Sequence, residues 1–170
     1  MRGMFHLYTG NGKGKTTAAI GLAVRALGAG FKVFFAQFVK GQEYSEIKIL
    51  NSLKNVTVKQ YGLDCFIRKE PTEDDIRAAK QGLNEVSQVL KSGEYQLVIL
   101  DEANIAVYYQ LFSSEQLLQA IENRAAAVEV VVTGRKADQK LIDQADLVTR
   151  MEEIKHYYQQ GIMARTGIEK

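Results

Sequence analysis

The sequence contains one cysteine, two histidines and no tryptophan. Cys65 has no second cysteine with which to form an internal disulfide, and one cysteine with two histidines provides too few ligands for an ordinary zinc site. A chain without disulfides fits a reducing compartment, so we expect a cytoplasmic protein. The order of serine, histidine and aspartate residues does not suggest a nucleophilic triad either.

Long apolar runs and an excess of one charge are missing as well. No stretch approaches the ~18 consecutive apolar residues of a membrane span, and the N-terminal segment holds no apolar run of signal-peptide length. The 22 basic residues nearly balance the 20 acidic ones, which leaves a formal net charge of +2. We therefore expect neither a membrane nor a nucleic acid as a partner.

The chain is large enough to bury a core by itself. It has 170 residues, of which 46% are hydrophobic, so neither disulfides nor a structural metal are required. Neither an internal repeat nor a break in composition marks a second unit. We expect a single domain over residues 1–170.

Apolar, strand-prone runs alternate with segments of helical periodicity. The expected strands cover residues 5–8, 32–38, 56–60, 95–100, 128–133 and 147–151. The expected helices cover residues 16–27, 76–90, 117–121 and 140–144, with capping pairs at Thr72 and Asp75 and at Ser113 and Gln116. This order predicts an α/β fold with a mainly parallel central sheet. Residues 152–170 lack a clean period, and we expect an ordered tail folded over the sheet edge or over a ligand.

A glycine-rich segment follows the first expected strand and precedes the first expected helix. It matches the phosphate-binding pattern G-x-x-x-x-G-K-[ST] at Gly14, Lys15 and Thr16, with Thr9 at the usual first glycine and Gly10 beside it. Glycines let the backbone approach an anion, and the following helix directs free N–H groups at it. An ordinary glycine-rich turn is the alternative. The ATP-binding residues predicted from this loop are Thr9, Gly10, Asn11, Gly12, Lys13, Gly14, Lys15, Thr16 and Thr17.

With this loop, the expected architecture becomes a P-loop NTPase-like three-layer α/β/α fold. Asp101 and Glu102 end an apolar strand, at the edge where open α/β sheets bind ligands. Such carboxylates, with the hydroxyl of Thr16, hold Mg²⁺ in P-loop proteins. We therefore predict Thr16, Asp101 and Glu102 as the metal site. The alternative is that the two acidic residues only cap the next helix.

Three further segments have two interpretations each. Arg135 ends another strand at the same edge and either contacts phosphate or a carboxylate partner, or lies on the surface without such a contact. The segment 37–41 either lines the site or forms a turn with a solvated lysine. His156 lies outside the expected strands and is more typical of a structural residue than of a catalyst.

Several motifs, taken together, resemble one enzyme family. They are Thr9-Gly-Asn-Gly-Lys-Gly-Lys-Thr-Thr17, Gln37-Phe-Val-Lys-Gly41, Leu100-Asp-Glu-Ala-Asn104, Val132-Thr-Gly-Arg135, Lys155-His156, Gly161-Ile162 and Gly167-Ile-Glu169. In this order and over nearly the whole chain, they resemble the ATP:corrinoid adenosyltransferases of the CobA/CobO/BtuR type. The phosphate loop alone also suits an ATPase, a kinase or a non-catalytic nucleotide-binding regulator, so the specificity comes from the other motifs.

The resemblance implies transfer of the 5′-deoxyadenosyl group of ATP to the Co(I) of a corrinoid, cobalamin or cobyrinic acid a,c-diamide, with release of triphosphate. It implies a role in cobalamin biosynthesis or salvage. ATP, Mg²⁺ and the corrinoid are the implied ligands, with ATP reversed relative to other P-loop proteins. Lys15 and Glu102 are the implied catalytic residues, and Arg135 is an implied ATP contact.

The resemblance also implies a corrinoid contact in the loop after the third strand. Phe66 matches an aromatic residue that excludes the lower corrin ligand in the family, and Arg68 stands near a position where some members carry tryptophan. These two residues are the predicted corrinoid-binding pair; the alternative for Phe66 is that it only packs under its loop. A homodimer and an electron-donating flavoprotein are the implied protein partners.

Overall fold

The computed structural model describes residues 2–41, 44–63 and 70–169. The strands are β1 Phe5–Thr9, β2 Val33–Phe38, β3 Val56–Tyr61, β4 Leu97–Asp101, β5 Glu129–Thr133 and β6 Leu147–Arg150. The helices are α1 Lys15–Gly28, α2 Ser45–Ser52, α3 Glu73–Ser92, α4 Ala103–Tyr108, α5 Ser114–Glu122 and α6 Gln139–Gln144, with a 3₁₀ turn at Tyr157–Gln160.

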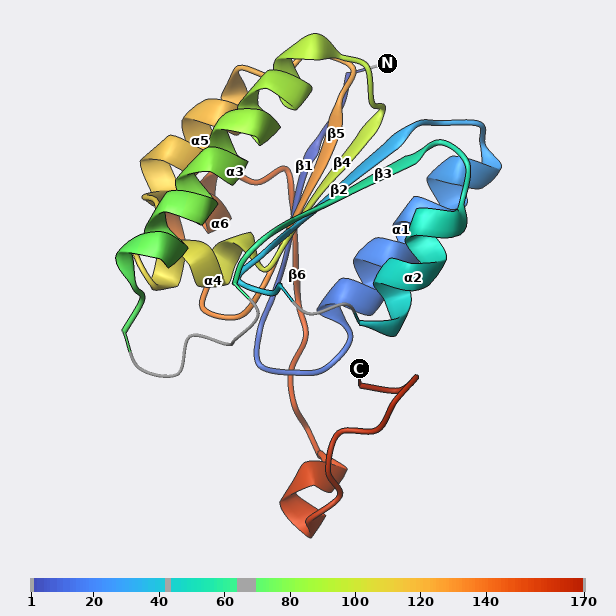
Figure 1. Ribbon diagram of the computed structural model, residues 1–170, viewed down its shortest axis with the longest axis vertical. Coiled ribbons are helices and arrows are strands. Elements are labelled where there is room, and N and C mark those ends of the chain that lie inside the picture. Colours follow the sequence, from blue (N-terminus) through green and yellow to red (C-terminus); the bar gives the residue numbers. More distant parts are fainter. Residues whose placement is uncertain (1, 42–43, 64–69, 170) are drawn as a thin grey trace.

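All six strands form one sheet in the order β3-β2-β4-β5-β1-β6, and every pair is parallel. Helices α1 and α2 cover one face, whereas α3, α4, α5 and α6 cover the other (Figure 1). The three-layer α/β/α arrangement predicted from the sequence is thereby confirmed. Because all strands run the same way, their carboxyl ends meet at one edge, where the loops after β1, β2, β4 and β5 lie together.

The hydrophobic core lies on both faces of the sheet, between the sheet and each helical layer. All six residues of β2 and all five of β4 are buried, as expected for parallel strands covered on both faces. Alternate residues of β2 contribute to different apolar clusters: Phe34 packs with the layer of α3, and Phe35 packs with the layer of α1. The edge strand β6 has all four residues exposed.

The helix ends follow the signals in the sequence. Thr72 and Asp75 form both hydrogen bonds of a capping box at the start of α3, and Ser113 and Gln116 do the same for α5. Helix α3 ends before Gly93, which adopts the left-handed conformation at φ 67°. These caps confirm the predicted helix starts.

Two helices were not predicted. Helix α2 buries only Ile47 and Leu50 and exposes Ile49, so its apolar pattern is weak over eight residues. Helix α4 has six residues and begins directly after β4, so its sequence reads as a continuation of the apolar strand. Short helices with so little periodicity form because tertiary packing stabilises them.

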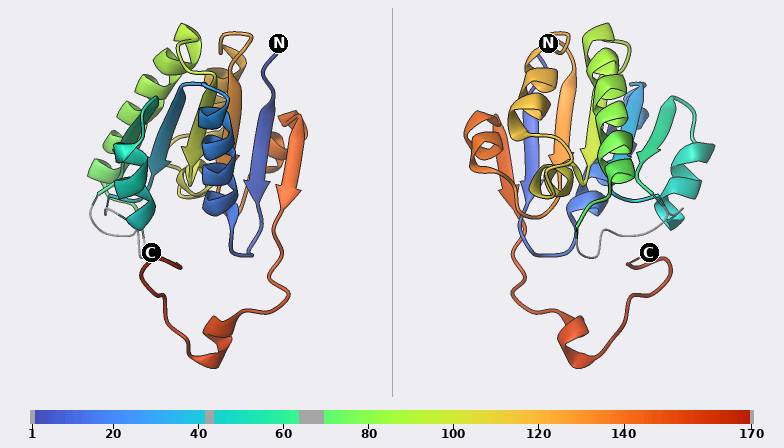
Figure 2. Two further views of the ribbon diagram at one scale, coloured as in Figure 1. Left: turned by 90° about the vertical axis from the view of Figure 1, so that its right-hand side faces the viewer. Right: turned by 60° about the vertical axis from the view of Figure 1, so that its left-hand side comes forward.

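The segment after β6 leaves the sheet and loops beneath the carboxyl ends of the strands (Figure 2). Its 3₁₀ turn is followed by residues that return toward the first turn of α1. We call residues 151–169 the tail. Among the described residues, no helix is long and apolar enough to cross a membrane.

The capping box of α3 supplies a first prediction. Thr72→Ala removes the hydroxyl that accepts from Asp75 N at 3.2 Å, and should lower the free energy of unfolding by about 1 kcal/mol. Urea denaturation monitored by circular dichroism measures this change. Gln88→Ala, an exposed substitution within the same helix, serves as the control and should stay within about 0.5 kcal/mol of the wild type. Equal stabilities of the two variants would contradict the capping assignment.

Candidate functional site

The loop between β1 and α1 has the geometry of a phosphate cradle. Gly10 and Gly14 adopt φ values of 97° and 114°, a region that side chains rarely enter. Gly14 is the N-cap of α1, and no side chain caps this end of the helix. The free N–H groups of the first turn therefore face the cavity next to the loop, where an anion is stabilised.

The side chain of Lys15, the first residue of α1, reaches back into this loop. Its ammonium donates hydrogen bonds to the carbonyl oxygens of Gly10 at 2.9 Å and Gly12 at 2.7 Å. Burial lowers the pKa of Lys15, and the positive charge of Arg135 acts in the same direction. The loop thus holds a partly desolvated cation, which an incoming phosphate would meet without a full water shell.

The loop is fixed by the chain that follows β6. Gly12 N donates to Met151 O at 2.8 Å, and Met151 N donates to Thr9 O at 2.8 Å. A Cβ atom on Gly12 would lie 2.8 Å from the carbonyl oxygen of Glu152, so only glycine fits this approach. The start of the tail is therefore part of the cradle.

Asp101 is the centre of a buried hydrogen-bond network. It is fully buried at the end of β4, and one carboxylate oxygen accepts from the hydroxyls of Thr16 at 2.8 Å and Thr133 at 2.7 Å. The other oxygen accepts from Gln37 Nε2 at 2.9 Å, and Gln37 in turn accepts from Gln60 at 2.9 Å. This network joins the ends of β2, β3, β4 and β5 to the first turn of α1.

Glu102 follows in a left-handed conformation, with φ at 58°. Its backbone N–H donates to the hydroxyl of Thr133 at 3.1 Å, and its carboxylate lies 3.6 Å from Lys40 Nζ. Burial and the charge of Asp101 raise the pKa of Glu102. Burial lowers the pKa of Lys40, but the charges of Asp101 and Glu102 outweigh it and the net pKa is raised.

A hydrogen bond brings the motifs around Asn104 and Arg135 together. Asn104 is fully buried and donates from Nδ2 to Gly134 O at 2.9 Å. This bond ties the start of α4 to the end of β5, which places Arg135 at the rim of the site. Arg135 is exposed and lines the cavity, so the structure favours the interpretation in which it can reach a ligand.

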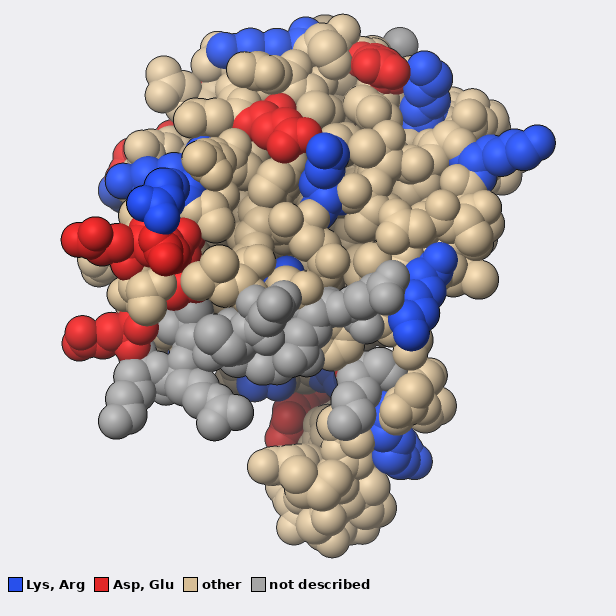
Figure 3. Space-filling view, viewed as in Figure 1, with Lys and Arg blue, Asp and Glu red and all other residues tan. Residues whose placement is uncertain are grey.

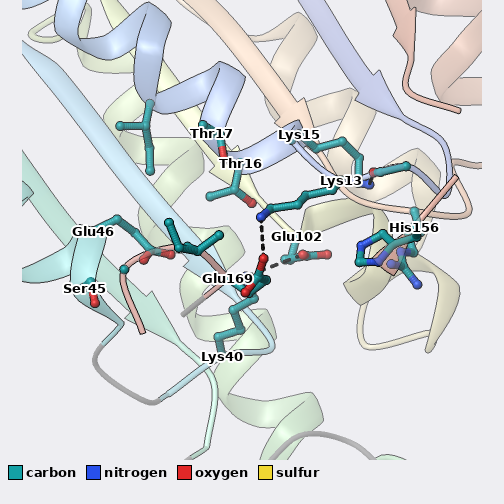
Figure 4. Close-up of a pocket in the computed structure, with 16 residues that line it drawn as sticks. Lys13, Lys15, Thr16, Thr17, Lys40, Ser45, Glu46, Glu102, His156 and Glu169 are labelled. Carbon is teal, nitrogen blue, oxygen red and sulfur yellow. Dashed lines mark hydrogen bonds and ion pairs between the residues drawn. The ribbon is translucent and has the colours of Figure 1, made fainter. Parts of the chain in front are cut away.

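These residues surround a cavity of about 630 Å³ (Figure 4). Its lining comes from the loop residues 12–14, from Lys15, Thr16, Thr17 and Ile20 of α1, from Lys40, Ser45, Glu46, Glu102 and Arg135, and from His156 and residues 167–169 of the tail. The volume is within the range of small-molecule and nucleotide sites. In the face shown in Figure 3, acidic side chains lie in the hollow between the tail and the body, with basic side chains on either side.

The tail closes this cavity through a cluster of charged and aromatic side chains. Lys13 Nζ lies 2.8 Å from a carboxylate oxygen of Glu169 and 3.0 Å from the hydroxyl of Tyr157. Arg165 and Tyr157 also contact Glu169, and Arg165 lies over the Tyr157 ring. Hydrogen bonds from Arg165 and Lys13 hold the pKa of Glu169 well below its usual range. The expectation that the tail folds over a ligand site agrees with this placement.

The residues present fit a magnesium ion. The hydroxyl of Thr16 donates to the carboxylate of Asp101 at 2.8 Å, and the carboxylates of Asp101 and Glu102 both lie within 3.8 Å of Lys40 Nζ, so three oxygen-bearing groups lie in one region. In the part of the chain that the structure describes, there is no group of three or more His, Cys, Asp or Glu side chains that could hold a metal alone. Mg²⁺ commonly takes only one or two protein carboxylates and completes its shell with phosphate and water.

The structure brings most of the predicted site residues together. Lys13, Lys15, Thr16, Thr17, Glu102 and Arg135 line one cavity, and Asp101 lies directly behind Thr16. Asn11 lines a neighbouring hollow with Arg135 instead. Phe66 and Arg68 lie outside the described residues.

Sequence reasoning missed Thr133, Tyr157 and Glu169 as parts of the site. The available signal for Thr133 was a polar threonine directly after the three valines of β5. The motif Gly167-Ile-Glu169 contributed to the family resemblance, but the sequence assigned no contact to Glu169 or Tyr157, because their contacts depend on how the tail folds back.

Comparisons with known proteins agree with this site. The family model of ATP:corrinoid adenosyltransferase BtuR/CobO/CobP matches residues 1–169. A corrinoid adenosyltransferase of Pseudomonas aeruginosa is 36% identical over 170 residues, covering 99% of this chain and 84% of the relative. A corrinoid adenosyltransferase of Escherichia coli K12 is 32% identical over 168 residues, covering 99% and 86%.

A solved structure supports the fold alone. The flagellar accessory protein FlaH from Methanocaldococcus jannaschii superposes with a TM-score of 0.64 at 15% identity, covering 88% of this chain and 71% of that one. The full-length family match and the curated relatives decide the identity: the chain belongs to the ATP:corrinoid adenosyltransferase family and is an enzyme that transfers the adenosyl group of ATP to a corrinoid.

Proposed function

We propose that the cradle holds the triphosphate of ATP as a leaving group, with the ribose 5′-carbon directed outward to the cobalt of the corrinoid. The electron pair of Co(I) forms the Co–C bond, the bond between C5′ and the phosphate oxygen breaks, and triphosphate departs with the electron pair of that C–O bond. The observation that supports this most is that Lys15 and Thr16 line one cavity beside a free helix N-terminus, with Asp101 hydrogen-bonded behind Thr16.

In this proposal, no protein side chain acts as a nucleophile. Lys15 leaves its two carbonyl partners and binds phosphate oxygens, so positive charge is placed where negative charge develops. The N–H groups of the loop and of the first turn of α1 stabilise the same charge. Lys13 and Arg135 add two further cations at the rim of the cavity. The rigid network around Asp101 keeps these groups in position before ATP binds.

We further propose that Thr16, Asp101 and Glu102 hold Mg²⁺ on the triphosphate, where it supplies additional charge stabilisation of the leaving group. Thr16 would offer its hydroxyl, which now donates to Asp101. Asp101 is kept in place by Thr133 and Gln37, so its orientation does not depend on the metal.

The remaining proposals rest on the family resemblance. Phe66 and Arg68 would contact the corrinoid, with Phe66 excluding the lower corrin ligand so that cobalt is easier to reduce. The enzyme would act as a homodimer of single-domain chains and take its electron from a flavoprotein. Its substrate would be cobalamin or cobyrinic acid a,c-diamide, in biosynthesis or salvage.

The orientation of ATP can be tested by product analysis. The protein is incubated with ATP, Mg²⁺, a cobalamin and a strong reductant, and the products are separated by chromatography. We expect adenosylcobalamin and inorganic triphosphate in equal amounts. Formation of ADP or phosphate in place of triphosphate would show that the cradle performs phosphoryl transfer and would refute the proposal.

Lys15→Ala should lower the rate of adenosylation at saturating ATP by more than about 100-fold, because it removes the charge closest to the departing triphosphate. The spectroscopic change on formation of the Co–C bond measures the rate. The control is Lys54→Ala, which removes the same charge at an exposed position away from the cavity. A Lys15→Ala rate within a few-fold of the control would contradict the role of Lys15.

Thr16→Ala should raise the Mg²⁺ concentration for half-maximal activity by about tenfold, because a metal ligand is lost. Thr16→Ser retains the hydroxyl and is the matched control, so its Mg²⁺ requirement should stay close to that of the wild type. Activity is titrated against free Mg²⁺ at constant ATP. Identical titrations for the alanine and serine variants would remove Thr16 from the metal site.

Phe66→Ala should lower the activity that starts from Co(II) much more than the activity on Co(I) reduced beforehand. The physical reason is that exclusion of the lower ligand favours reduction of cobalt and has no part in the attack on carbon. Both activities are measured on the same preparation, with Phe31→Ala as the control at an exposed phenylalanine. Equal losses in both assays would indicate that Phe66 has only a packing role.

A further inference from the structure

Lys40 lies at the centre of the site without a role in the reaction described above. It follows β2, and its Nζ lies 3.8 Å from a carboxylate oxygen of Asp101 and 3.6 Å from one of Glu102. Its side chain is only 18% exposed. In Figure 4, Lys40 points toward Glu102 from the side of the cavity opposite Lys15.

The backbone around Lys40 is held in an unfavourable conformation. Val39 is buried and adopts φ 67°, a left-handed conformation that is rare and strained for a β-branched residue. This turn directs the chain back over the carboxyl end of the sheet immediately after β2. A strained backbone conformation persists only where the surrounding structure holds it in place, and such conformations are concentrated at functional sites.

Two glycines, Gly41 and Gly62, allow close backbone packing next to Lys40. A Cβ atom on Gly62 would lie 2.6 Å from Lys40 N, and one on Gly41 would lie 2.6 Å from the carbonyl carbon of Leu63. The backbones after β2 and after β3 therefore pack against each other without side chains between them. This contact sets the position of the Lys40 backbone, whereas the Lys40 side chain can change its conformation.

The electrostatics explain why a cation is needed at this place. Asp101 is fully buried and Glu102 follows it directly, so two negative charges lie together with little solvent. Thr16, Thr133 and Gln37 already donate to both oxygens of Asp101. Lys40 neutralises the pair by charge, since its distances to both carboxylates exceed those of a good hydrogen bond.

We propose that Lys40 is a displaceable counter-ion that occupies the place of the divalent cation and competes with it for Asp101 and Glu102. Mg²⁺ entering with ATP takes over the two carboxylates, and the Lys40 ammonium moves into the cavity, toward the phosphates. Lys40 is thus a positioning residue: it keeps the carboxylates in place before the metal binds, and it lowers the affinity for a metal that arrives without nucleotide. This inference rests on the metal site proposed above.

The test measures binding of Mn²⁺ alone, by electron paramagnetic resonance of the free ion, to the nucleotide-free protein. Lys40→Met should tighten Mn²⁺ binding by about tenfold, because one positive charge beside the two carboxylates is removed. Lys59→Met is the matched control, since Lys59 also pairs with a carboxylate, Glu85 at 3.5 Å, but lies on β3 away from the cavity. The control should bind Mn²⁺ as the wild type does.

A second pair of variants covers the case in which Lys40→Met does not fold. Glu102→Gln keeps Lys40 beside Asp101 and should bind Mn²⁺ more weakly than the wild type. The double variant Lys40→Met/Glu102→Gln removes one charge of each sign and frees Asp101, so it should bind Mn²⁺ more tightly than Glu102→Gln. Equal or weaker binding by the double variant would overturn the proposal.

Asp101→Asn separates this inference from the metal site on which it rests. Mn²⁺ binding that Asp101→Asn abolishes, and that Lys40→Met tightens, supports both. Binding that Asp101→Asn abolishes but Lys40→Met leaves unchanged or weakens would retain the metal site and overturn the role of Lys40. Binding that Asp101→Asn leaves unchanged would overturn both. Unchanged Mn²⁺ affinity together with weaker ATP binding in Lys40→Met would make Lys40 a phosphate ligand only.

Discussion

The buried carboxylate of Asp101 is the interaction on which the site depends. A charge with no exposure is stable only when its oxygens are satisfied, and Thr16, Thr133 and Gln37 provide this from three different elements. Each of these donors is thereby fixed relative to the others. The network aligns the ends of β2, β4 and β5 with the first turn of α1, so the phosphate loop, the proposed metal ligands and the rim are joined by hydrogen bonds.

The parallel sheet makes this network possible. Strand β5 lies between β4 and β1, so Thr133 at its end contacts both acidic residues at the end of β4 and pairs with Tyr8 of β1, the strand that leads into the phosphate loop. The loop itself is clamped on its other side by the chain after β6, through hydrogen bonds of Gly12 and Thr9 with Met151. Hydrogen bonds therefore fix the loop on both sides before a ligand binds. This suits a reaction in which a leaving group must be held and a carbon presented to cobalt.

The predictions from sequence succeeded where the physics is local. The capping boxes at Thr72 and Ser113, the glycine loop and the apolar strands are all indicated by residue patterns within a few positions, and the structure shows these elements. Helix α2 and helix α4 were missed because each is short and carries little apolar periodicity. The acidic pair was placed at the correct edge, since parallel strands must end together, but the pairing of Asp101 with Thr133 and Gln37 could not be read from a linear pattern.

The sequence by itself determined the phosphate loop, the acidic strand end, the α/β class and the family, because these depend on residue types at fixed spacing. Only the tertiary structure decided which groups satisfy Asp101, where Lys40 places its charge and how Glu169 reaches Lys13 across 156 residues. These contacts join segments far apart in the chain. Their formation depends on strand order and on the path of the tail, which no local propensity encodes.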